Sequence, residues 1–146
     1  MVTNFYTYPV EFRKDRNGTV VALVPDVPGT MTVGADREEA LERVQGALLA
    51  MLAARIDDHE PIPRPSRPGR GQRVTTLPPV VAAKLSIYQT SRASQKSAED
   101  LRMLLGWDEP RVRRVLDLRR RARFEDLEAV LKALGKRLVV AVENAP

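Results

Sequence analysis

The densest group of reactive side chains is a run of arginines in the last third of the chain. Seven arginines and one acid, Asp117, lie between residues 111 and 123, giving this segment a charge of +6. Arginine can bind guanine O6 and N7 through its forked guanidinium and can neutralise backbone phosphates. The segment therefore predicts a DNA-binding surface. The expected contacts are Glu109, Arg111, Arg113, Arg114, Arg119, Arg120 and Arg121.

Two other interpretations of the arginine run stay open. Arginine is favoured near the C-terminus of a helix because of the helix dipole, so the run could be a solvated face. RNA is the alternative ligand. Against RNA, the chain has no series of exposed aromatic residues interleaved with basic ones on which single-stranded bases could stack.

Side chains for hydrolytic or metal chemistry are scarce. The chain has no cysteine and one histidine, His59, which excludes thiolate nucleophiles, zinc ribbons and paired-histidine metal sites. His59 follows Asp57 and Asp58 at the expected end of a helix, where a cation suits the dipole, so we expect a structural role. We therefore predict a binding protein rather than an enzyme, with no cofactor and no metal.

Charge divides the 146-residue chain into an acidic and a basic half. The net charge of +5 resolves into −3 for residues 1–59, +3 for 60–76 and +5 for 77–146. Residues 61–77 contain prolines and glycines without an apolar pattern, which predicts an exposed, partly stiff linker between domains 1–60 and 78–146. No apolar run could cross a bilayer and no signal peptide is evident, so we expect a cytoplasmic protein.

The first domain is expected to be β-β-β-α. Residues 6–13 alternate between apolar and polar, as in a half-buried strand, and Asn17-Gly18 favours a hairpin into a second strand at 19–24. A third short strand is expected at 30–34, after two prolines.

A helix should follow, from a capping box of Asp36 and Glu39 to about Asp58. One amphipathic helix covers one face of a three-stranded sheet. The opposite face is then either wet or buried against another molecule.

The second domain is expected to be all-α. Helices are predicted at 80–90, 98–105, 109–118 and 124–134, with Ser97 and Asp108 as N-caps. Gly106 separates the second and third helices, which is the order of a helix-turn-helix motif. Its apolar positions are Leu101, Leu105, Trp107, Val112 and Val115.

Two features of this domain raise structural questions. Arg102 falls where close helix packing usually needs a small residue, unless its stem turns outward. Residues 138–142 form a short apolar strand without a partner in the domain. Pairing with the same strand of a second subunit would satisfy its edges and supply two recognition helices; packing as a tail on its own domain is the alternative.

The order of several motifs resembles the HicB antitoxin family in its helix-turn-helix branch. No single motif is specific, but together they cover nearly the whole chain. They are Tyr8-Pro9-Val10, Val24-Pro25-Asp26-Val27-Pro28-Gly29, Glu38-Glu39-Ala40-Leu41-Glu42, Glu60-Pro61-Ile62-Pro63-Arg64-Pro65-Ser66, Ala82-Ala83-Lys84-Leu85 and Leu134-Gly135-Lys136-Arg137-Leu138.

The resemblance implies an α+β protein with a partial RNase H-like N-terminal domain, a linker and a helix-turn-helix domain with a short terminal strand. It implies binding of a HicA-type toxin, a small ribonuclease that cleaves mRNA through a histidine, and repression of the operon at an operator in double-stranded DNA. A homodimer or higher oligomer and no membrane association are expected. The candidate toxin contacts are Tyr8, Glu11, Asp26 and Met31.

Two alternatives to an antitoxin and autorepressor remain. One is a transcriptional regulator whose N-terminal domain serves ligand binding or assembly without a toxin. The other is an enzyme of the RNase H type, which needs carboxylates converging on two Mg²⁺ ions. The acids of the first domain, such as Glu11, Asp15 and Asp26, are scattered over a strand, a turn and a loop, so we do not expect that site.

Overall fold

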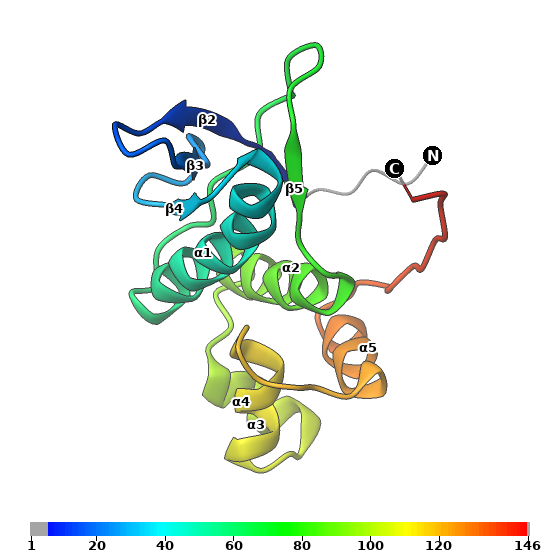
Figure 1. Cartoon of the computed structure of the whole chain (residues 1–146). Helices are drawn as coiled ribbons and strands as arrows, with labels where there is room; N and C mark the ends of the chain where they lie inside the picture. Colours follow the sequence, from blue (N-terminus) through cyan, green and yellow to red (C-terminus); the bar gives the residue numbers. More distant parts are fainter. Residues whose placement is uncertain (1–5, 146) are drawn as a thin grey trace. The chain divides into compact units, whose positions relative to one another are not determined.

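The structure is a computed structural model that describes residues 6–145 (Figure 1). The chain forms two compact units, the first ending at Pro78 and the second beginning at Pro79. The first unit contains strands and one long helix, and the second contains four helices. This confirms the predicted α+β class.

The first unit is built around an antiparallel sheet. Its order is β2-β3-β4, from Glu11–Lys14, Val20–Leu23 and Met31–Gly34. Gly18 at φ +81° forms the tight connection between β2 and β3, as Asn-Gly predicts. Helix α1, Arg37–Asp57, packs on the face that carries the buried Val20 and Ala22. Its own buried residues are Ala40, Val44, Leu48, Leu52 and Ala53.

The predicted strand at 6–13 is divided in two, whereas the three expected antiparallel strands are present in the order β2-β3-β4. Its first part is β1, Thr7–Pro9, which leaves the main sheet and pairs antiparallel with β5, Val74–Thr76. The two ladders separate at Val10, whose N–H donates to Arg73 O at 2.9 Å instead of to β3. The continuous alternation of apolar and polar residues at 6–13 thus covers two strands, which belong to different sheets.

Residues 61–77 are packed onto the first unit, although they were predicted as an exposed linker. Prolines do keep 61–68 out of a ladder, but β5 follows them with β-branched residues and no proline. Leu77 is 1% exposed, and Ile62 is also buried. The Tyr8 hydroxyl donates to Pro63 O at 2.8 Å, and Asp26 accepts from Ser66 N and Oγ at 2.7 and 2.9 Å.

The start of α1 follows only half of the predicted capping box. Asp36 accepts from Glu39 N at 2.9 Å, as expected for an N-cap. The Glu39 carboxylate instead pairs with Arg43 one turn on, at 2.7 Å. Gly34 precedes this turn and lies close to the backbone of α1. A Cβ added to Gly34 would be 2.4 Å from Ala40 N.

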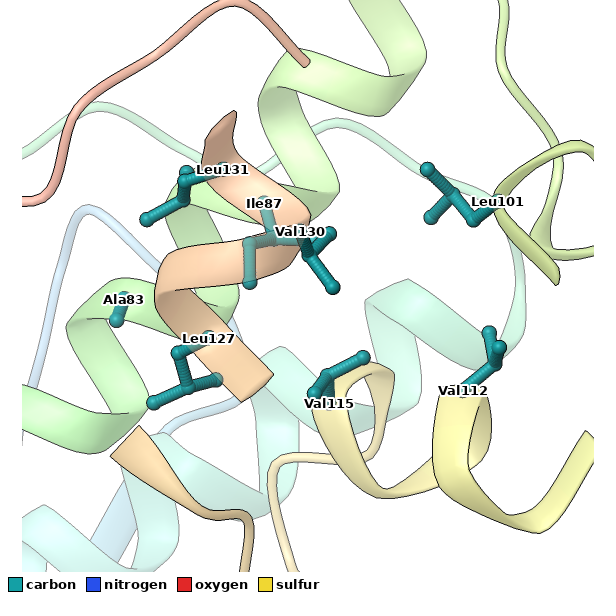
Figure 2. Packing of buried hydrophobic residues seen from close by; sticks show 8 residues of the cluster. All are labelled: Ala83, Ile87, Leu101, Val112, Val115, Leu127, Val130 and Leu131. Atoms are coloured by element: carbon teal, nitrogen blue, oxygen red, sulfur yellow. The ribbon is translucent and has the colours of Figure 1, made fainter. Parts of the chain in front are cut away.

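The second unit contains the predicted helix-turn-helix. Helices α2, Pro79–Ala93, α3, Ala98–Leu105, α4, Glu109–Leu116, and α5, Phe124–Ala133, surround one apolar core (Figure 2). Ser97 and Asp108 cap their helices, and Gly106 ends α3 at φ +68°. The core residues are Ala83, Ile87, Leu101, Val112, Val115, Leu127, Val130 and Leu131.

Two questions raised by the sequence have structural answers. The Arg102 side chain turns outward and pairs with Glu99 at 2.7 Å, so its bulk does not separate α3 from α4. Residues 136–145 form neither helix nor strand in the single chain. Leu138 packs against the apolar core, whereas Val140 and Val142 are 67% and 96% exposed.

Candidate nucleic-acid interface and partner-binding face

The predicted recognition helix α4 is amphipathic and fixed at both ends. Asp108 caps it by accepting from Arg111 N at 3.0 Å, and Asp117 N donates back to Arg113 O at 2.9 Å. Val112 and Val115 point into the core, which leaves Arg113 and Arg114 exposed on the other side. The helix thus presents cationic side chains from a rigid support.

Arg111 has a structural role that the sequence did not reveal. Its guanidinium makes two hydrogen bonds to Asp126 in α5, at 3.2 and 2.8 Å, and lies 4.1 Å from the centre of the Trp107 ring. The hydrogen bonds from Arg111 hold the pKa of the buried Asp126 carboxyl below its usual value. Arg111 therefore ties α4 to α5, although it was predicted as a DNA contact.

Glu109 and Arg113, two predicted DNA contacts, are paired with each other. They lie one turn apart on α4 and form an exposed ion pair. An exposed pair of this kind contributes little to stability, so Arg113 can exchange the carboxylate for a base or phosphate at small cost.

The loop after α4 is held from inside by Lys84 of α2. The Lys84 ammonium is fully buried and donates to Asp117 O at 2.6 Å and to Arg120 O. Burial lowers the pKa of Lys84. Lys84 is not among the predicted site residues, although it lies three residues after Val81 and four before Tyr88, within the apolar stripe of the predicted helix.

The Asp117 side chain orders the beginning of the same loop. Its carboxylate accepts from Arg119 N and Nε, both at 3.0 Å, and pairs with Arg120 at 3.4 Å. Burial opposes ionisation of Asp117, but the hydrogen bonds and positive charge of these arginines outweigh it and lower its pKa. The predicted contacts Arg119, Arg120 and Arg121 therefore follow a backbone with defined hydrogen bonds and remain exposed.

A second candidate surface is the face of the first unit's sheet that α1 does not cover. Direct partners in an antiparallel ladder point to the same face. The register therefore places Glu11, Leu23 and Met31 in one row and Arg13, Val21 and Val33 in the next. Met31 is 60% exposed, and Val33 is also exposed. We call these six residues the open sheet face.

The four predicted toxin contacts do not lie on one surface. Glu11 and Met31 are on the open sheet face. Tyr8 is fully buried, and its hydroxyl donates a hydrogen bond to Pro63 O. Burial raises the pKa of Tyr8. Asp26 holds Ser66 in place. The strand alternation groups Tyr8 with Phe12 but gives no sign of β5, in which Thr75 is the ladder partner of Tyr8.

The acids of the first unit are the candidates for an RNase H-like metal site. Within residues 6–145, no group of three or more His, Cys, Asp or Glu side chains is placed to hold a metal ion. None of the described helices is long and apolar enough to span a bilayer.

Comparison with known proteins identifies the family. Residues 7–86 match the family model described as a HicB-like antitoxin of bacterial toxin-antitoxin systems. The chain belongs to this HicB-like antitoxin family. The matched residues include β5 and the start of α2, so the segment predicted as a linker lies within the part of the chain that the family model matches.

HicB relatives extend over both units of the chain. Antitoxin HicB 2 of Photorhabdus laumondii is 34% identical over 131 residues, 90% of this chain and 92% of the relative. Antitoxin HicB of Pseudomonas fluorescens is 29% identical over 96% of both chains. Antitoxin HicB of Escherichia coli K12 is 27% identical over 90% of this chain and 95% of the relative.

Proposed function

We propose that this chain is an antitoxin that neutralises a HicA-type ribonuclease and represses its own operon. Family membership carries the antitoxin assignment. The two further activities are assigned to two surfaces, one on each unit.

Toxin binding is assigned to the open sheet face. It combines aliphatic side chains with Glu11 and Arg13 at its margin, which is the composition of a surface suited to a protein partner. The net charge of −3 over residues 1–59 is cancelled by the +3 of residues 60–76, which belong to the same unit, so the choice of an RNA-cleaving partner rests on the family and not on net charge. Catalytic groups then belong to the toxin.

DNA binding is assigned to α4 and the loop that Lys84 holds. A helix-turn-helix places such a helix in the major groove, and two half-sites require two copies of the protein. The exposed valines of residues 139–142 are the proposed dimer contact, by pairing with the same segment of a second chain.

Co-expression with the neighbouring genes tests the antitoxin assignment. A small basic protein should co-purify with the chain, and the chain should relieve its toxicity. Met31→Glu should abolish both effects because it places a charge in the contact, whereas Ala50→Glu, an equal charge on the exposed side of α1, should leave them intact. If no toxic partner co-purifies, the proposal of toxin neutralisation is refuted, and a DNA-binding regulator remains as the alternative.

Operator binding tests the second assignment. Arg113→Ala should reduce discrimination between the upstream DNA and random DNA by about 1–3 kcal/mol if it makes a bidentate base contact. Arg120→Ala should weaken binding to both and flatten the salt dependence. Equal binding of both variants and the parent at moderate salt would refute the assignment of α4.

A further inference from the structure

An arginine-lined cleft opens between α4, the loop after it and the start of α5. Its volume is about 670 Å³, and its lining residues are Arg111, Arg114, Arg121, Ala122, Arg123 and Asp126. The residues of this arginine cleft come from both sides of the loop that Lys84 holds. A concave site concentrates the field of the charges that line it.

The charges of the arginine cleft do not balance. Four arginines face one carboxylate, Asp126, and Arg111 makes two hydrogen bonds to it. Arg114 and Arg123 line the cleft together with Asp126, and their charges also lower the pKa of this carboxyl. An excess of three positive charges remains on Arg114, Arg121 and Arg123.

The backbone around the arginine cleft is prepared for a ligand of the opposite charge. Helix α5 begins at Phe124, and its N-cap, Arg123, makes no side-chain capping hydrogen bond. Its first turn carries Glu125, which is exposed, and Asp126, which is hydrogen-bonded to Arg111. The end of a helix that bears its free N–H groups favours an anion. Lys84 and Asp117 already fix the preceding loop, so ligand binding loses less conformational entropy than it would with a flexible loop.

We infer that the arginine cleft is a phosphate-binding site formed by Arg114, Arg121 and Arg123, with Arg111 as a positioning residue. Guanidinium groups bind phosphate oxygens in pairs, and three of them from two elements can surround one tetrahedral anion. The phosphate can be a phosphodiester of bound DNA or a free pyrophosphate-like anion. The DNA source rests on the proposed function, whereas the free anion does not.

The site would separate two kinds of contact on one surface. Arg113 lies outside the arginine cleft and remains available for a base edge, while a phosphate held in the cleft would fix the position of α4 along the duplex. Arg113 and Arg114 were both predicted as DNA contacts, and the cleft assigns Arg114 to a phosphate of the DNA backbone.

Inorganic pyrophosphate and a duplex from upstream of the gene are the two probes. Trp107 is the single tryptophan and stacks on Arg111, so its fluorescence reports on the cleft. The full-length parent, Arg114→Gln, Arg121→Gln and the control Arg67→Gln are titrated with each probe. Arg67 is exposed in the first unit, so the control removes the same charge elsewhere.

Binding of pyrophosphate by the parent, weakened about tenfold or more in both cleft variants and unchanged in Arg67→Gln, would support the site. With the duplex, each cleft variant should bind more weakly on every sequence, and its salt slope should fall by about 1. Pyrophosphate should also compete with the duplex.

The outcomes separate the cleft from the proposed function. Pyrophosphate binding lost in the cleft variants, without duplex binding by the parent, would support the cleft and refute the repressor. Duplex binding that is equal in all four proteins, with no effect of pyrophosphate, would overturn the cleft and leave the repressor standing.

Discussion

Arg111 and Asp126 show that one arginine in a predicted DNA-binding segment can belong to the fold. The carboxylate is buried and accepts two hydrogen bonds from the guanidinium, which also covers Trp107. Removing one partner of a buried pair costs more than the pair itself contributes, because the other partner is left unsatisfied. This pair therefore connects α4 to α5.

Replacing Asp126 with asparagine should destabilise the second unit by about 1–2 kcal/mol at pH 7, because a charged acceptor is lost. The pKa of Asp126 in the fold lies below its usual 3.8, so its contribution is present above pH 3.8 and is lost as the pH falls through the lowered pKa. Urea unfolding followed by Trp107 fluorescence should show the two proteins converging at acidic pH.

The matched control for Asp126 is Glu125→Gln, an exposed neighbour in the same turn of α5. It should remain close to the parent at every pH. Equal stability of Asp126→Asn and the parent at pH 7 would show that the hydrogen bonds to Arg111 contribute nothing to the fold.

At the residue scale, sequence patterns predicted types of side chain better than their partners. Val112, Val115 and the caps Ser97 and Asp108 follow from local spacing, and all lie as predicted. Arg111 and Tyr8 depend on residues 15 and 55 positions away, Asp126 and Pro63, which no local pattern indicates. Lys84 is intermediate, since a lysine within an apolar stripe does indicate a buried ammonium that needs acceptors.

At the element scale, the contact of β4 with α1 depends on a glycine. An added Cβ on Gly34 would meet Ala40 N at 2.4 Å and Ala40 Cα at 2.8 Å, and both are backbone atoms that cannot rotate away. The end of the strand can approach the first turn of the helix only without a side chain. This approach lets α1 cover the sheet directly after a two-residue connection.

Gly34→Ala should destabilise the first unit by about 1–3 kcal/mol through overpacking. Gly46→Ala is the control, since Gly46 lies inside α1 with open space around its Cβ position and should stabilise the helix by about 0.5–1 kcal/mol. Hydrogen exchange of the β3 amides measures both effects. Protection that changes in the same direction for both variants would contradict this explanation.

The elements themselves were largely predictable, because helices are defined by local caps and periodicity. Helix α3 has the predicted ends, and α2, α4 and α5 differ by a few residues. The division of the first strand was not predictable, because β5 lies more than 60 residues away and its register is set by tertiary contacts. The prolines and glycines of residues 61–71 are typical of a linker, so they give no indication that the chain returns to pair with β1.

At the scale of the whole molecule, the position of the boundary decides which fragments can fold. The structure ends the first unit at Pro78, beyond the expected end at residue 60. Ile62 and Leu77 are buried, and β5 covers one side of β1. A fragment that stops at residue 60 lacks all of these contacts.

Fragment 1–78 should therefore unfold cooperatively on heating, and fragment 1–60 should not. The missing burial of Ile62 and Leu77 is worth about 3–6 kcal/mol by area, a large part of the stability of a small unit. Thermal circular dichroism of the two fragments measures the difference. Identical cooperative transitions would show that residues 61–78 are indeed a linker.

The valines at the end of the chain should control the number of subunits. Val140→Asp places a charge in the proposed pairing of residues 139–142 and should shift the protein to a monomer with weaker operator binding. Asn144→Asp adds the same charge beyond this segment and should leave the oligomer intact. Sedimentation of both variants tests the pairing, and two oligomers like the parent would contradict it.

The pairing of β1 with β5 also determines how the first unit responds to force. Thr7 faces Thr76 at one end of this ladder, and the chain enters at Tyr6 and leaves at Leu77 on the same side. A force applied at Tyr6 and Leu77 therefore breaks the hydrogen bonds between β1 and β5 one after another. It does not load all of them at once in shear. A pull on the two ends of the unit is thus expected to separate β5, the strand that completes the unit, from β1 pair by pair, beginning at Thr7 and Thr76.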